Sequence, residues 1–482
     1  MARLWTLLDG RRISRRMAPY PQAMRSTYIS RLAAATRGLQ WPLVLFLIIV
    51  FFLTSQDLFF SQRYAEEFSL DPMASTKTIT EGQPSRQIAL LALGLFGVLS
   101  LFRKRGEPSA VKGWLGVLVG FYLSWSFLSI LWTQDLQLTS KRLIVLLMLC
   151  LGAVAAARHL RSQNLSKFTF CAAGFYLVLG ILAEVVLHTF HPSLGGYRFC
   201  GTVHPNRQAM NCALLLLASV CGSSISIRGR RWFQLCAVVA LVFLVLTGSR
   251  TALWSATLCV FVYWSLVWSR WRKLAAVFCV VSASALFLLL FCDSSMPALT
   301  GIALLGRDAS AETLTGRYPL WQECMNYVGK HPILGHGYGA FWTVRHIVEI
   351  SFTSPWSPSE AHSTYIDSLL DLGILGGLTL ISVFVLGIKR SISHYRETHD
   401  PNFAFAAVLL LFCALDGALE SIISQPELIT FLCMVVVARL CFRWIPEKEV
   451  GCESRYHYRR LYLQSGRGAR ARAGELSPAR NA

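Results

Sequence analysis

The sequence predicts an all-α protein that crosses a membrane several times. Its 482 residues are 54% hydrophobic and only 15% charged, and the mean hydropathy is +0.47. Soluble domains carry about 25% charged residues, so the excess of apolar side chains must face something other than water. Long apolar runs joined by short basic connections are typical of transmembrane helices.

Twelve apolar segments are candidates for spanning helices. A span needs roughly 20 mostly apolar residues, or about 17 at the short end. The second, fourth and seventh candidates are short, so the count depends on them. The predicted spans are 39–57, 88–102, 112–133, 142–157, 167–188, 208–227, 232–247, 252–269, 273–292, 363–388, 403–420 and 427–445.

Basic residues orient these spans. The formal net charge is +20, and the basic groups lie mostly between apolar runs. If the N-terminus is cytosolic, every cytosolic connection is basic, as the positive-inside rule requires. Both termini are then cytosolic. The groups concerned are 103–105, 158–161, 228–231, 270–273, 389–390 and the tail from Lys448 to Arg480.

The two ends of the chain lie outside the predicted membrane domain, residues 39–445. Residues 1–38 hold eight arginines and one aspartate without an apolar core. This composition excludes a cleavable signal and predicts a cytosolic basic arm that contacts anionic headgroups. Residues 446–482 are basic, and their end is rich in Gly, Arg, Ser and Ala. We expect a disordered cytosolic tail there.

One extracytoplasmic loop, residues 293–362, is much longer than the others. A connection of this length usually has a function or a structure of its own. The segment Tyr318–Gly329 predicts a short helix because Pro319 lies in its first turn. The turn-rich segment 331–339 would end that helix.

Several classes of function lack support. The chain contains no GxGxxG or GxxxxGK[ST] motif, so a nucleotide site is not expected. None of its 14 cysteines forms a CxxC pair, and we predict no metal and no cofactor. The basic residues serve membrane orientation, so no nucleic-acid partner is expected. A disulfide between Cys200 and Cys324, both predicted outside, is left open.

The candidate site residues all fall on the predicted outer side. Arg250 lies in a turn between two apolar runs, Arg317 lies in the long loop, and His362 precedes the next span. Guanidinium groups bind phosphate oxygens in a bidentate fork, and a histidine exchanges a proton near neutral pH. This combination predicts a site for a phosphorylated lipid. The other polar residues on this side are Arg198, His204, Asn206, Arg207, Arg307, His331, His336, Arg345 and His346.

Each candidate also has a purely structural interpretation. An arginine at a helix end can extend to the headgroups without a catalytic role. Polar residues before a helix can act as caps, and buried acids can be packing contacts. These alternatives are a snorkelling Arg250, an Arg317–Glu312 ion pair, capping by His204, Asn206 or His362, and buried polar contacts at Glu184 and Asp416.

Four segments resemble the O-antigen ligase and Wzy-type polymerase superfamily of bacterial envelope polysaccharide assembly. Segment 201–206 resembles its G-x-x-x-P-N motif, and 247–252 resembles its S-R turn. Segment 315–337 resembles R-x-x-x-W…P-x-x-G-x-G, and 361–376 resembles H-N-x-x-L…G-x-x-G, with Ser363 in place of the asparagine. The resemblance covers about residues 190–380.

The resemblance implies a glycosyltransferase at the periplasmic face of the bacterial inner membrane. A glycan would pass from undecaprenyl diphosphate to an acceptor hydroxyl. The acceptor is lipid A–core for a ligase and another lipid-linked repeat unit for a polymerase. We expect Arg250 and Arg317 to hold the diphosphate, with Arg198 or Arg207 assisting, and His362 to act as general base.

A polysaccharide-intermediate transporter or flippase remains the alternative from another class. Its polar residues would lie near the bilayer midplane, whereas here they lie in outer loops.

Overall fold

The described part of the protein is entirely helical. The computed structural model describes residues 56–66, 84–102, 113–159, 162–194, 196–268, 317–352 and 358–442, and none of these forms a strand. The all-α prediction is therefore confirmed for these residues. The predicted span 273–292, nearly all of 39–57, both terminal segments and Arg307 lie outside them. The count of twelve spans stays a prediction.

Six helices in the described ranges are long and apolar enough to cross a membrane. They are α6 with its 3-10 extension η1 (Trp114–Leu128 and Ser129–Leu131), α7 (Leu136–His159), α8 (Ser162–Val186), α9 (Pro205–Ile225), α11 (Arg250–Val267) and α16 (Thr364–Thr398). The remaining helices are α3 (Phe60–Glu66), α5 (Pro84–Phe102), α10 (Arg230–Leu246), α14 (Arg317–Lys330), α15 (Val344–Ser351), α17 (Pro401–Asp416) and α18 (Leu428–Cys441). The chain is a multi-pass membrane protein.

Most helix boundaries differ from the predicted spans by a few residues, and three differences matter for the site. Helix α7 begins at Leu136 instead of 142, and α16 continues to Thr398 instead of ending at 388. Helix α17 stops at Asp416, although the apolar pattern continues to 420. The early stop has a tertiary cause, because the backbone carbonyls of Gly417 and Glu420 both accept from the amide of Thr364. The residues after α17 thereby become a loop against the start of α16.

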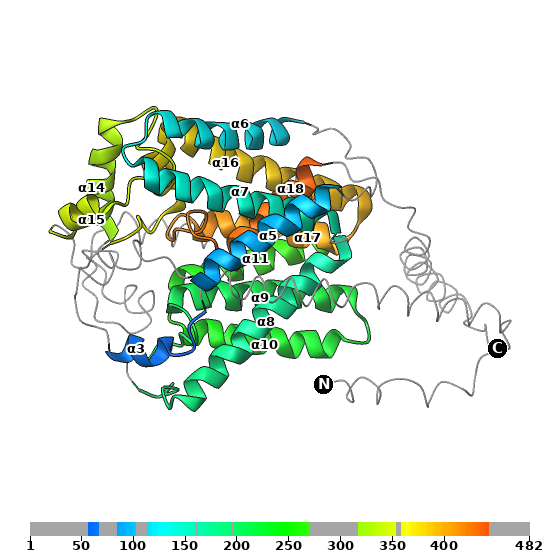
Figure 1. Cartoon of the computed structure of the whole chain (residues 1–482). Coiled ribbons are helices and arrows are strands. Elements are labelled where there is room, and N and C mark those ends of the chain that lie inside the picture. The colour runs from blue at the N-terminus through cyan, green and yellow to red at the C-terminus, as the bar shows by residue number, and fades with distance from the viewer. Residues whose placement is uncertain are drawn as a thin grey trace, which may run out of the picture.

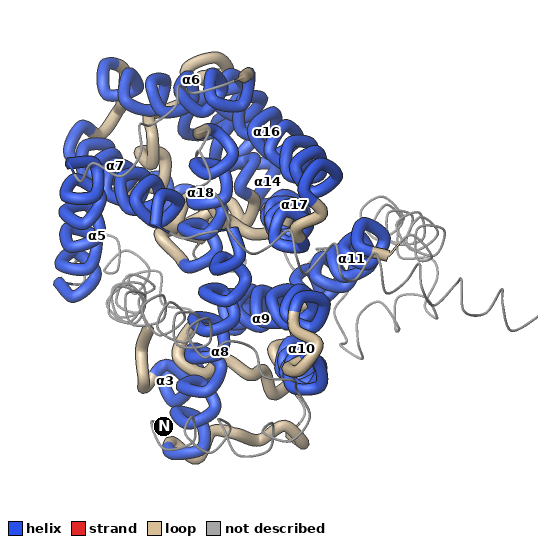
Figure 2. Tube along the Cα trace, turned by 90° about the vertical axis from the view of Figure 1, so that its right-hand side faces the viewer, coloured by secondary structure: helices blue, strands red, loops and turns tan. Residues whose placement is uncertain are grey.

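Helix α9 lies at the centre of the bundle. It packs against α8, α10, α11 and α17, and Figure 2 shows these helices around it. In the apolar window of α9, 83% of the residues are buried, whereas only 17% are buried in the window of α6. Helix α6 therefore lies at the edge (Figure 1), where its apolar side chains would face lipid.

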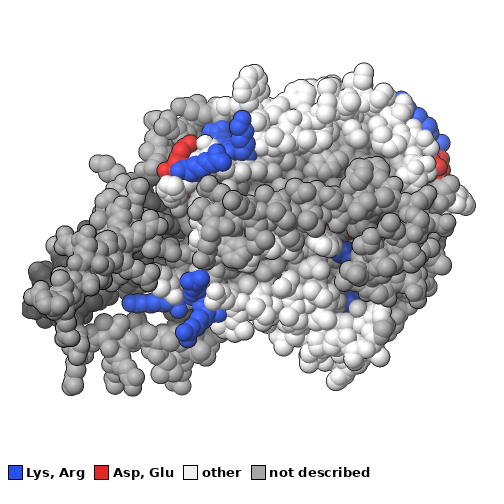
Figure 3. Space-filling model, turned by 180° about the vertical axis from the view of Figure 1, so that it is seen from behind, with Lys and Arg blue, Asp and Glu red and all other residues white. Residues whose placement is uncertain are grey.

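Charged side chains avoid the middle of the described surface. In Figure 3 two groups of Lys and Arg mark the end of the molecule away from α14 and α15. Arg228 lies in the connection between α9 and α10, Arg230 begins α10, and Lys389 and Arg390 lie in the C-terminal part of α16. A largely uncharged band beside them suits a bilayer. Which end faces the cytosol stays a prediction.

Helices α14 and α15 form a small second core. Leu320 and Cys324 of α14 pack with Ile347 of α15, and Phe341 and Leu370 complete the cluster. Because Leu370 belongs to α16, this core attaches the segment between α11 and α16 to the bundle. The predicted helix 318–329 is confirmed as α14.

A break in α16 provides the binding place for the loop that follows α14. Gly373 has φ 67° and interrupts the helical backbone. The loop after α14 fills the interruption: the amide of His336 donates to the carbonyl of Leu370 at 2.8 Å, and that of Ile374 donates to Pro332 at 2.8 Å. The indole of Trp125 donates to the carbonyl of Leu372 at 3.1 Å. Buried carbonyls that lose helical partners need such replacements.

Gly373→Ala should destabilise the protein because alanine is strained at positive φ and its Cβ would lie 2.1 Å from the carbonyl oxygen of Ile333. The left-handed conformation costs about 1–2 kcal/mol, and the overlap adds about 1–3 kcal/mol. Thermal unfolding in detergent, followed by tryptophan fluorescence, measures the loss. Gly120→Ala is the control, since a Cβ there meets nothing within 4 Å. Equal melting of both variants would contradict this account of the break.

Candidate functional site

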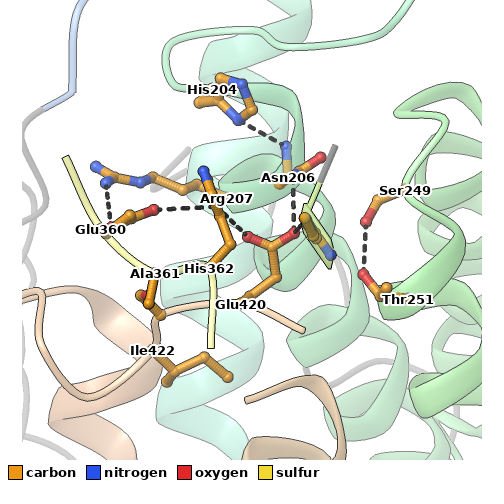
Figure 4. A network of polar contacts seen from close by, with 12 residues as sticks. His204, Asn206, Arg207, Ser249, Thr251, Glu360, Ala361, His362, Glu420 and Ile422 are labelled. Carbon is orange, nitrogen blue, oxygen red and sulfur yellow. Dashed lines mark hydrogen bonds and ion pairs between the residues drawn. The ribbon is translucent and has the colours of Figure 1, made fainter. Parts of the chain in front are cut away.

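Five segments distant in sequence meet beside the first turns of α9, α11 and α16. They are the loop before α9, the turn 247–249, the start of α14, the segment 358–363, and the loop 417–427 between α17 and α18. Each contributes to a polar network, and Figure 4 shows its centre around Asn206, Glu420, His362, Glu360 and Arg207. Which side chains contact one another in that network determines what the site can do.

Arg198 connects the loop before α9 to the turn that carries Arg250. Its Nε donates to the carbonyl of Thr247 at 2.8 Å, and its NH2 donates to Oδ1 of Asn206 at 2.6 Å. The loop itself is fixed by buried Glu184, whose Oε1 accepts from the amides of Cys200 at 2.9 Å and Gly201 at 2.7 Å. Glu184 is thus a buried structural contact, as its alternative interpretation held.

His204 and Asn206 start helix α9. The ring of His204 accepts from the amide of Asn206 at 3.3 Å as an N-cap, and Pro205 follows at the first helical position. Burial, followed by the charges of Arg198 and Arg207, lowers the pKa of His204 to about 3. His204 is therefore neutral near pH 7 and serves the helix start. Asn206 also connects the start of α9 to the loop after α17, because its Nδ2 donates to Oε1 of Glu420 at 2.8 Å.

Glu420 is the centre of the network. Its Oε1 accepts from NH2 of Arg317 at 2.6 Å, and its Oε2 lies 3.6 Å from Nδ1 of His362. Burial by itself would raise the pKa of this carboxyl, but the hydrogen bond from His362 and the charge of Arg317 outweigh burial and lower it to about 2. The group is ionised. Arg317 thus pairs with Glu420, whereas Glu312 lies outside the described residues.

His362 lies between two carboxylates. Figure 4 shows its ring between Glu420 and Glu360, and Nδ1 is 3.5 Å from Oε1 of Glu360. Burial lowers the pKa of this imidazole, but hydrogen bonding to Glu420 and the charges of both carboxylates prevail, so the net shift is upward. Because Nδ1 faces the acids, Nε2 is the nitrogen left for proton exchange with another group.

Buried Asp367 holds the backbone that carries His362. His362 has φ 49°, a left-handed conformation that persists in a non-glycine residue only when its surroundings enforce it. Oδ1 of Asp367 accepts from the amide of Ala361 at 3.0 Å and from the indole of Trp342 at 3.0 Å. Its other oxygen accepts from the hydroxyl of Ser421, next to Glu420. One carboxylate therefore fixes both partners of the His362–Glu420 pair.

Arg207 forms a second ion group beside the first. Its Nε lies 2.8 Å from Oε1 of Glu427, and its NH2 lies 4.0 Å from Oε2 of Glu360. Arg250 is the half-buried first residue of α11, directly after the turn bound by Arg198. The structure thus connects Arg198, Arg207, Arg317 and His362 through hydrogen bonds and ion pairs. Arg250 follows the turn that Arg198 binds.

Other candidates lie elsewhere. Arg345 is exposed and pairs with Glu349 at 2.8 Å. His336 and His346 pack with Tyr327 and Phe341 in the small core, and burial lowers the pKa of His336 to about 4. His331 contacts the ring of His336 at its exposed side. Asp416 is fully buried in α17. Cys200 and Cys324 are both free thiols, so the disulfide alternative is not realised.

The sequence interpretation missed Glu360, Asp367, Glu420 and Glu427. Glu420 was placed inside the predicted span 403–420, where its charge went unremarked. The signal that could have found it is a carboxylate at the end of an apolar run, where a charge needs a partner. Asp367 lies five residues after His362 in an apolar run, where an acid is costly without partners.

Glu360, His362 and Glu420 also have the composition of a cation site, since their ligand atoms lie within 4.8 Å of one another. Carboxylate oxygens and imidazole nitrogen suit several divalent ions. However, Arg317 and Arg207 already face these carboxylates. A cation would therefore compete with guanidinium groups for the same oxygens.

Glu420→Gln should lower the pKa of His362, because the amide removes the charge and hydrogen bond that raise it while burial and Arg317 continue to lower it. Diethylpyrocarbonate modifies neutral imidazole, so the pH dependence of His362 modification, followed by peptide mass spectrometry, reports this change. The midpoint should move to lower pH in the variant. The exposed His191 serves as internal reference. An unmoved midpoint would mean that Glu420 does not control this histidine.

Comparisons with known proteins agree with this geometry. Residues 235–381 match the Wzy_C family, described as O-Antigen ligase, and this range contains Arg250, Arg317 and His362. The chain is 27% identical over 118 residues to the exopolysaccharide production protein ExoQ of Rhizobium meliloti, covering 23% of this chain and 27% of that protein. It is 26% identical over 158 residues to an O-antigen ligase of Pseudomonas aeruginosa, covering 31% and 37%.

These matches thus span about a third of each curated relative, or less. The matched segment and both relatives point the same way: over this part of the chain the protein is similar to the O-antigen ligase superfamily.

Proposed function

We propose that this protein transfers a glycan from undecaprenyl diphosphate to an acceptor hydroxyl at the periplasmic face of the bacterial inner membrane. Similarity to the O-antigen ligase family over residues 235–381 supports a membrane glycosyl-transfer role in polysaccharide assembly. The observation that carries the proposal is one network of arginines around His362: Arg317 binds Glu420 directly, and Arg198 reaches Glu420 through Asn206. Arg207 binds Glu427 and lies 4.0 Å from Glu360, the other carboxylate beside His362. Both termini would lie in the cytosol.

The arginines suit a diphosphate. Arg317 is only 13% exposed and binds Glu420 at 2.6 Å, so this carboxylate occupies the position an anionic ligand would take. A diphosphate carries more charge than one carboxylate and can accept from several guanidinium groups at once. Arg250 and Arg317 would bind it, with Arg198 or Arg207 assisting. Their fixed charges would then stabilise the negative charge that grows on the leaving group.

His362 would act as general base. The acceptor oxygen attacks the anomeric carbon of the donor sugar, and its proton passes to Nε2 of His362. The bond from that carbon to the phosphate oxygen breaks, and its electron pair leaves with undecaprenyl diphosphate. Glu420 and Glu360, both within 3.6 Å of Nδ1, stabilise the imidazolium that results. The proton then returns to water.

Ligase and polymerase activities differ only in the acceptor. The relatives carry both an O-antigen ligase name and an exopolysaccharide production name, and we place the ligase first because the family description matches it. Lipid analysis of a deletion strain separates the two. Long lipid-linked glycan should accumulate without a ligase, whereas single repeat units accumulate without a polymerase.

A transporter remains the second candidate because α16 is broken at Gly373, and broken helices are common at transporter binding sites. In those proteins the freed backbone groups bind substrate or ions. Here the loop residues Pro332 and His336 already bond to the backbone around Gly373. Transfer assayed in detergent, without any gradient, distinguishes the classes, because only a transferase yields a covalent product.

Arg317→Ala should reduce transfer about 10²–10³-fold by removing fixed charge at the leaving group, and His362→Ala should reduce it about 10²–10⁴-fold by removing the base. Purified protein with lipid-linked donor and acceptor provides the assay. Arg345→Ala and His191→Ala are matched controls, because both side chains are exposed and away from the network. Full activity in Arg317→Ala and His362→Ala would remove the mechanism.

EDTA should leave transfer unchanged, because Arg317 and Arg207 supply the positive charge that a metal ion would otherwise bring. The rate is measured with and without EDTA, and after adding Mg²⁺ or Mn²⁺. Loss of activity that a divalent ion restores would instead assign Glu360, His362 and Glu420 to a metal centre.

A further inference from the structure

A cavity lies beside the segment that carries His362. It is bounded by α6, α7, the start of α16 and the loop before α18, and it encloses about 780 Å³ counted with its open mouth. Glu360 and Thr364, the residues two before and two after His362, both line it. His362 therefore belongs to a segment that borders this cavity on one hand and contacts Glu420, the partner of Arg317, on the other.

The lining combines opposite charges with aromatic rings. Arg142 of α7 and Asp371 of α16 both line the cavity, and within the described ranges no salt bridge joins either one to another side chain. Tyr338, Trp342 and Gln425 add two rings and an amide. Sugar hydroxyls both donate and accept, so they match a guanidinium, a carboxylate and an amide together. About half of the lining residues are polar or charged, which suits a ligand rich in hydroxyl groups.

Hydrogen bonds to Asp367 hold one wall of the cavity in place. Asp367 accepts hydrogen bonds from the indole of Trp342 at 3.0 Å and from the amide of Ala361 at 3.0 Å. Its carboxylate therefore positions these two residues. Ser421 and Ser424 of the loop before α18 also donate to this carboxylate. The same residue thereby positions the cavity wall and the histidine.

We propose that this cavity binds the acceptor sugar, with Arg142, Asp371 and Gln425 contacting its hydroxyls and Trp342 or Tyr338 covering a ring face. The inference rests on the proposed function and deepens it. The donor diphosphate lies on the arginines, the acceptor glycan lies in the cavity, and the base lies between them. Two sources share this chemistry: the core oligosaccharide of lipid A–core and the terminal sugar of a lipid-linked repeat unit.

Arg142→Met tests the assignment because it removes the guanidinium but keeps the stem that packs beside Gly339. The KM for acceptor should rise about ten-fold, as loss of a charged hydrogen bond implies, while the KM for donor stays within about two-fold. Lys141→Met, an exposed neighbour on α7, is the control. Gln425→Ala is the second variant, since the backbone carbonyl of Gln425, and not its side chain, supports α18. Unchanged acceptor KM in both variants overturns the inference, and so does a rise in donor KM instead.

Direct binding separates this inference from the proposed function. Lipid-free core oligosaccharide and free repeat unit, both from the host strain, are titrated calorimetrically into the full chain in detergent. Binding of one glycan, weakened about ten-fold by Arg142→Met, supports the cavity assignment and identifies the source. Equal binding by wild type and variant, or no binding of either glycan, overturns it. Glycan binding without any transfer product would retain the cavity and remove the glycosyltransferase.

Discussion

The buried charge of Glu420 is the constraint on which the site depends. An ionised carboxylate with a 6% exposed side chain is tolerated only with close cationic or hydrogen-bonding partners. Arg317, Asn206 and His362 supply them from three different parts of the chain. The same carboxylate thereby assembles the loops and holds the arginines near the histidine. Without it, the cationic side chains would repel one another at the end of an apolar bundle.

Backbone irregularities place these partners. Helix α17 ends at Asp416, so Glu420 enters a loop instead of facing lipid. Helix α16 is broken at Gly373, and the loop after α14 fits into the break. That contact brings α14, and with it Arg317, next to the first turns of α16. His362 keeps a left-handed backbone because Asp367 binds the amide before it. Each departure from regular helix therefore has a partner and a consequence for the site.

The sequence predicted the helices well and the site in part. Hydropathy finds α9 and α16 because their apolar windows are long, and the arginine in the 247–252 turn stands out because charge is costly there. Arg198, Arg207 and Arg317 do lie in one polar network, and their binding of phosphate stays a prediction. Asp367 and Glu420 were missed because their role depends on partners far away in sequence. The break at Gly373 was missed because one glycine in an apolar run is compatible with an unbroken helix.

The most direct test of the account is a structure of the protein with undecaprenyl diphosphate bound. We expect the diphosphate within hydrogen-bond distance of Arg317 and Arg250, with the contact between Arg317 and Glu420 broken or shared and His362 still beside Glu420. The lipid tail should leave between apolar helices. A diphosphate bound away from both arginines, with the Arg317–Glu420 pair intact, would contradict the central claim.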